Sequence, residues 1–145
     1  MQRIFIVLAC LTVSANLGVS APALKDPKKE QDTTRILGQW VVESISVHGD
    51  PPENGQASMV RFSKDGTCGI TNGDRENGAI YSLNPSASPS RMKWLNGPEM
   101  TEWLCLYEFT GNNLKVAFVH PNSTVPEKIE PTKSLTIYYL TRQKE

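Results

Sequence analysis

Histidine is nearly absent from this chain of 145 residues, which contains only His48 and His120. They lie far apart in the sequence, and no His-x-x-x-His or Cys-x-x-Cys spacing supplies the ligands of a zinc site. No Gly-x-Ser-x-Gly elbow places a nucleophile, and no glycine-rich phosphate loop opens a helix. We therefore expect no metal, no cofactor and no enzymatic activity. An enzyme would require a cleft that gathers one histidine with a carboxylate such as Glu43, Glu102 or Glu108.

An excess of either charge is also absent, since 15 lysines and arginines balance 15 aspartates and glutamates. The densest group of lysines, at residues 25–30 (KDPKKE), is interrupted by acids. A chain without a basic patch has no strong electrostatic attraction for nucleic acid or for an anionic membrane surface. The sequence therefore predicts no nucleic-acid partner.

Long apolar runs are missing too, because the longest one, at residues 4–13, is too short to span a bilayer. It follows Arg3 and leads into a stretch of small residues that ends at Ala23. This pattern is typical of a secretory signal peptide over residues 1–23, so we expect a secreted or periplasmic protein without a membrane span. The alternative is a lipoprotein signal in which Cys10 is the acylated residue.

Short runs with high β-propensity make up most of what is present. Residues 24–35 are polar and have no apolar period, which predicts a flexible leader. Over residues 36–145, runs rich in β-branched and aromatic residues alternate with Gly, Asn, Asp and Pro turns, and none has a helical period. The pattern predicts eight strands, at residues 38–47, 58–63, 67–71, 78–83, 91–95, 102–109, 114–119 and 134–141.

The number and spacing of these strands predict how they pair. Short connections favour antiparallel pairing between sequence neighbours, and eight strands are enough for such a meander to close on itself and remove its free edges. We therefore predict an all-β fold, an eight-stranded antiparallel up-and-down barrel of lipocalin-like type, with a β-sandwich as the alternative. In this barrel Cys68 and Cys105 lie on the third and sixth strands, so a disulfide between them would favour the sandwich or a flattened barrel.

Alternation along the strands predicts which side chains face the interior. On the last three strands it groups Trp103, Cys105, Tyr107 and Phe109; Leu114, Val116 and Phe118; and Leu135, Ile137 and Tyr139. Such residues either fill a small barrel or line a pocket. A filled barrel would favour a non-enzymatic envelope or secreted module that binds another protein. A pocket would favour a carrier of a small apolar ligand, lined by Trp40, Tyr81, Trp94, Tyr107, Phe118 and Tyr139.

Several short motifs occur in a fixed order over residues 36–142, among them LGQWVV at 37–42, GAIYSLNP at 78–85 and YEFTGNNLKV at 107–116. In this order they resemble a small secreted domain of unknown function that is abundant in planctomycete bacteria. The resemblance implies a lipocalin-like barrel and no established activity. The Gly38-x-Trp40 pair is also similar to the opening signature of true lipocalins, which implies that Trp40 closes one barrel end and stacks on Arg142.

Overall fold

The computed structural model describes residues 27–55 and 58–144 of the chain. The predicted signal peptide at residues 1–23 and the alternative acylation site Cys10 lie outside the described residues, so both stay predictions. Within the described residues the chain forms one helix and nine strands: α1 (Pro27–Arg35), β1 (Gly38–Val47), β2 (Glu53–Asn54), β3 (Ser58–Phe62), β4 (Thr67–Asn72), β5 (Arg75–Asn84), β6 (Arg91–Asn96), β7 (Thr101–Thr110), β8 (Asn113–Val119) and β9 (Leu135–Arg142).

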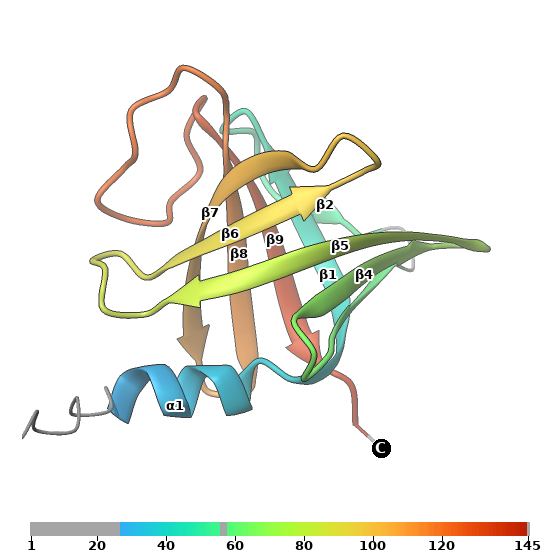
Figure 1. The fold of residues 1–145 in the computed structure, drawn as a ribbon. Helices are drawn as coiled ribbons and strands as arrows, with labels where there is room; N and C mark the ends of the chain where they lie inside the picture. The colour runs from blue at the N-terminus through green and yellow to red at the C-terminus, as the bar shows by residue number, and fades with distance from the viewer. Residues whose placement is uncertain (1–26, 56–57, 145) are drawn as a thin grey trace, which may run out of the picture.

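Eight of these strands form a closed antiparallel barrel (Figure 1). From β3 to β9 each strand pairs with the next one in sequence, and β1 closes the ring by pairing with β3 on one side and β9 on the other. In the closing pair Trp40 lies opposite Arg142 and Val42 lies opposite Leu140, with a bulge between Val42 and Ser44. Each predicted strand overlaps one of these eight. The predicted all-β up-and-down barrel is confirmed, and the sandwich alternative is not formed.

The ninth strand, β2, is an addition that the sequence does not predict. Its two residues pair with Ser44 and Ile45 of β1, and the backbone N–H of Gly55 donates to the carbonyl of Glu43 at 2.8 Å. A strand of two residues carries no recognisable alternation, and this one directly follows two prolines. It pairs with the part of β1 that follows the residues paired with β3, and it does not change how the barrel closes.

Helix α1 occupies a segment where the sequence predicts a flexible leader. It lies across one end of the barrel, which we call the closed end (Figure 1). Pro27 suits the first helical turn, where a backbone N–H is not needed, while Glu30 in the first turn and Arg35 in the last turn complement the helix dipole. The helix is polar almost throughout, so it has no apolar stripe for periodicity to detect. Contacts with the barrel, described below, hold it in place.

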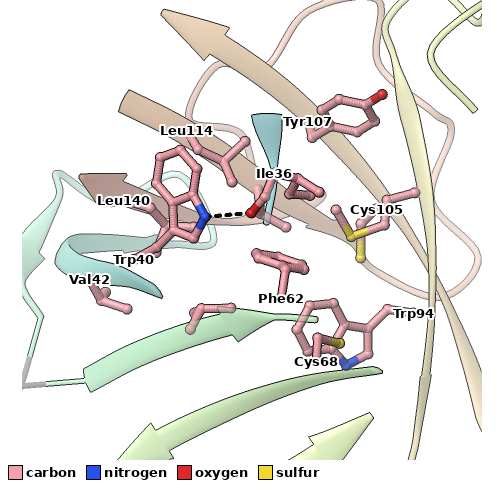
Figure 2. Close-up of a cluster of buried hydrophobic side chains, with 13 residues drawn as sticks. Ile36, Trp40, Val42, Phe62, Cys68, Trp94, Cys105, Tyr107, Leu114 and Leu140 are labelled. Atoms are coloured by element: carbon pink, nitrogen blue, oxygen red, sulfur yellow. Dashed lines mark hydrogen bonds between the residues drawn. The ribbon is translucent and has the colours of Figure 1, made fainter. Parts of the chain in front are cut away.

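Apolar side chains gather in two clusters on opposite faces of the strands. The larger fills the barrel and includes Trp40, Phe62, Trp94, Cys105 and Tyr107 (Figure 2). The smaller lies outside the barrel, where the loop between β8 and β9 covers the outward faces of the last strands; its buried members are Leu106, Ala117, Val119, Ile129, Leu135 and Ile137. Cys68 and Cys105 are both free and buried, as expected for cysteines on strands that are not neighbours.

Candidate functional site

Five of the six predicted pocket residues are brought together inside the barrel. Trp40, Trp94 and Tyr107 are buried members of the interior cluster, and Tyr81 and Phe118 are partly buried against it. The sixth prediction, an inward Tyr139, is wrong: this residue packs against the outer cluster. Its neighbours Tyr138 and Leu140 face the interior instead. The alternation on β9 is therefore one residue out of phase with the predicted one.

Trp40 lies at the closed end and is held on two sides. Its indole N–H donates to the carbonyl of Ile36 at 2.8 Å (Figure 2), and the guanidinium carbon of Arg142 lies 4.5 Å from the ring centroid. Gly38 fits here because a Cβ would come within 3.2 Å of Arg142 Nη1, and its φ is +109°. The predicted stacking of Arg142 on Trp40 is confirmed. Both residues thereby close the barrel end, leaving Trp40 no exposed face for a ligand.

Tyr107 connects the barrel wall to α1. Its hydroxyl donates to Asp32 Oδ2 at 2.8 Å, and both side chains are buried. Burial, together with the acceptor Asp32, raises the pKa of the Tyr107 hydroxyl, so the group stays protonated and remains a donor. At the end of the helix, Arg35 Nη2 donates to the carbonyl of Gly111 at 2.7 Å, and its guanidinium lies 4.5 Å from the Phe109 ring centroid. These contacts explain why a polar helix docks on the barrel.

The interior towards the opposite end, which we call the open end, is filled by aromatic rings. Phe118 is central, with ring centroid distances of 5.4 Å to Trp94, 5.5 Å to Tyr138 and 6.3 Å to Trp103. The cavity lined by Phe118, Trp94 and Tyr138 has a volume of about 10 Å³. A space of that size holds about one water molecule. Of the predicted pocket residues, Trp94 and Phe118 therefore pack against each other and line a void of only this size.

A much larger space, the cleft, opens outside the barrel beside the closed end and has a volume of about 1010 Å³. Its walls are α1, the loop at residues 85–90 between β5 and β6, and residues 127–130 of the loop between β8 and β9. Charged side chains of both signs line it: Lys28, Arg35, Lys115 and Lys128 with Asp32, Glu108, Glu127 and Glu130.

The cleft is mostly polar, with a smaller apolar contribution. Glu108 and Lys115 form an ion pair at 3.4 Å between neighbouring strands, while Pro89 and the buried Ile129 add apolar contacts. Such a surface suits a polar chain that carries charges of both signs. Sequence reasoning missed the cleft because α1, which forms one wall, has no pattern that predicts a helix.

Two of the three carboxylates that an enzyme would need are ion-paired with lysines. Glu102 pairs with Lys93 at 3.1 Å, and Glu108 pairs with Lys115. His48 and His120 instead contact each other. Within residues 27–55 and 58–144, no group of three or more His, Cys, Asp or Glu side chains is arranged to hold a metal ion. No helix in the same part of the chain is long and apolar enough to cross a membrane.

Comparisons with known proteins identify no family for this chain. No family model matches the chain, and a search of curated proteins finds no significant match. The resemblance to the planctomycete secreted domain therefore stays a prediction.

Proposed function

We propose that the chain is a non-enzymatic secreted or envelope module with a filled barrel, and that it binds a segment of another protein in the cleft beside α1. The contrast between two volumes carries this proposal: the interior cavity measures about 10 Å³ and the cleft about 1010 Å³. Pockets that enclose a small ligand measure about 300–1,000 Å³. Of these two spaces, only the cleft is large enough for a partner.

The lining of the cleft supports a peptide as the partner. Its exposed rim carries Lys128 together with Glu127 and Glu130, so it can pair with a chain that has both charges. Rim charges of this kind act mainly on association rate and selectivity. Ile129 and the prolines of the 85–90 loop offer apolar surface for one or two side chains.

A photoreactive amino acid at Gln31, an exposed cleft residue on α1, tests this function directly. The matched control carries the same group at Asp74, an exposed residue in the turn between β4 and β5. After illumination in the cell envelope and secreted fractions, we expect one defined protein adduct from position 31 and none from position 74. Charge reversal of Lys128 to Glu should weaken the adduct. Equal labelling from both positions would contradict the proposal.

A second candidate function is the carriage of a small apolar molecule at the open end. The observation that favours it is the half-buried state of Phe118, Trp103 and Tyr138, which leaves apolar ring surface accessible there. A ligand could enter only after the Phe118 ring moves. Native mass spectrometry of the protein from its own secreted fraction separates the two functions. A carrier retains a bound molecule of roughly the mass of a lipid. The interaction module has the mass of the polypeptide alone.

A further inference from the structure

The two histidines of the chain are neighbours in space although they are distant in the sequence. Their ring centroids lie 4.7 Å apart, with an interplanar angle of 81°. His48 directly follows β1, and His120 directly follows β8. Both strands pair antiparallel with β9, one on each side, so their C-terminal ends meet at the start of β9. The closure of the barrel therefore creates the pair.

The start of β9 fixes both histidines from the backbone. The N–H of His48 donates to the carbonyl of Leu135 at 3.3 Å, and the N–H of His120 donates to the carbonyl of Ser134 at 2.9 Å. His48 adopts a φ of 55°, in the left-handed region that non-glycine residues seldom occupy. The backbone of both histidines is therefore held beside the start of β9.

The ring of His120 is also oriented by a side chain. Its Nε2 lies 2.9 Å from the hydroxyl oxygen of Thr136. When Nε2–H donates to that oxygen, the lone pair is on Nδ1. Metal-binding histidines are held in this way by a second hydrogen bond, which sets the tautomer and the direction of the free nitrogen. His48 is exposed, so its ring can rotate to meet an ion without disturbing the core.

We propose that His48 and His120 form a surface binding site for a divalent transition-metal ion, oriented by Thr136. Imidazole nitrogens bind such an ion at about 2.0–2.1 Å, which places the two ring centroids roughly 4.5–5.2 Å apart for bond angles between 90° and tetrahedral. The observed separation of 4.7 Å falls in this range. Because the two rings meet edge to face at 81°, one ring has to turn before both nitrogens point at the same ion, and the exposed His48 ring can make that turn.

The site supplies two ligands and leaves the remaining positions to water or to a group from outside. No third His, Cys, Asp or Glu joins the pair within the described residues. Two neutral imidazoles favour Cu²⁺, Ni²⁺ and Zn²⁺ over Mg²⁺ and Ca²⁺, which prefer oxygen ligands. Among these ions Cu²⁺ should bind most tightly, following the usual order of divalent metal affinities.

Calorimetric titration of the tag-free protein with CuSO₄ at pH 7.5 tests the site. We expect one equivalent to bind, with affinity reduced at least tenfold in His48→Asn and in His120→Gln. Asparagine tolerates the left-handed backbone at position 48, and glutamine retains a hydrogen-bonding group near Thr136. Thr136→Val should weaken binding about tenfold, the lower end of the effect of losing an orienting partner. The double variant His48→Asn/His120→Gln measures copper held by the amino terminus or by carboxylates.

A spectroscopic measurement on the unaltered protein keeps the test decisive if a variant folds poorly. Electron paramagnetic resonance of the 1:1 Cu²⁺ complex should show two imidazole nitrogens, and NMR titration with Zn²⁺ should shift the ring signals of both histidines together. The proposal is overturned if copper binds equally well to the double variant. It is also overturned if only one histidine responds to Zn²⁺.

Discussion

Arg142 stacks on Trp40 across the seam where the barrel closes, with the guanidinium carbon 4.5 Å from the ring centroid. The two residues are direct partners in the pairing of β1 with β9. Arg142 Nη1 also donates to the carbonyl of Leu37 at 2.8 Å, and Nη2 donates to the carbonyl of Arg35. One guanidinium thus joins the first strand, the last strand and the end of α1.

Replacing Arg142 by alanine should lower the free energy of unfolding by about 3 kcal/mol, since hydrogen bonds from a charged group contribute about 1.5–3 kcal/mol and the ring contact about 1 kcal/mol. Arg142→Lys keeps the charge but loses the planar fork, so we expect an intermediate loss. Urea unfolding followed by tryptophan fluorescence measures both. The control is Arg91→Ala, an exposed position on β6 where a change within about 0.5 kcal/mol is expected. An equal loss of unfolding free energy in Arg91→Ala and Arg142→Ala would contradict the role of Arg142 in closing the barrel.

The hydrogen bond between Tyr107 and Asp32 should couple α1 to the barrel. Tyr107→Phe leaves the Asp32 carboxylate buried without its donor, which costs about 1–3 kcal/mol. A double-mutant cycle with Asp32→Ala should give an interaction energy of about 0.5–3 kcal/mol. Hydrogen exchange supplies a local readout, because backbone amides of α1 should exchange faster in either single variant while those of β3 and β4 keep their protection. Unchanged exchange in α1 would show that other contacts hold the helix.

The sequence predicts the barrel well because the information lies in local patterns. Alternating β-branched and aromatic runs between turn residues locate all eight barrel strands, and one such turn, between β3 and β4, contains Gly66 with a φ of +84°. The phase of alternation is harder to read. Arg142 stacks on the interior Trp40, so residues of the same parity, Tyr138 and Leu140, must also face inward. Tyr139 cannot share that face. The predicted contact between Arg142 and Trp40 therefore already implied that Tyr139 faces outward.

The cleft and the histidine pair could not be predicted for a different reason. One wall of the cleft is a polar helix, stabilised by single contacts such as Tyr107 with Asp32 rather than by an apolar face. The histidines meet only because β9 pairs with both β1 and β8. The residues next to His48 and His120 in the sequence do not indicate such a long-range pairing.

The two interior thiols should stay unreactive in the folded protein and make stability depend on alkaline pH. Burial raises the pKa of the Cys68 thiol to about 12, whereas an exposed thiol has a pKa of about 8.5. Burial also raises the pKa of Cys105. The unfolded chain therefore loses these protons at a lower pH than the folded chain does, and stability should decrease as pH rises from about 9 to 12.

Urea unfolding at a series of pH values from 8 to about 10.5 measures this decrease, and Cys68→Ala should make it shallower. In a chain that begins at Leu24, a thiol reagent should label no cysteine at pH 8 under native conditions and both in urea. A mass lower by two hydrogens, with no label in urea, would mean a disulfide and would contradict the free cysteines.

Removing the Phe118 ring should turn the filled interior into a binding cavity. Phe118 contacts Trp94, Trp103 and Tyr138, and it adjoins the existing void of about 10 Å³. Phe118→Ala should therefore lower stability by about 3 kcal/mol, the lower end for a phenylalanine truncation because the ring is half-buried. Apolar cavities made in this way stay dry and bind small apolar molecules.

We expect benzene to bind Phe118→Ala and raise its melting temperature, with no such effect on the unaltered protein. The matched control is Phe118→Leu, which keeps most of the side-chain volume and should neither bind benzene nor lose more than about 1.5 kcal/mol. Equal stabilisation of the unaltered protein by benzene would mean that the aromatic rings part readily in solution. That outcome would favour the carrier of a small apolar ligand over the interaction module. A variant that loses little stability and binds nothing would mean that the Phe118 ring does not fill the open end.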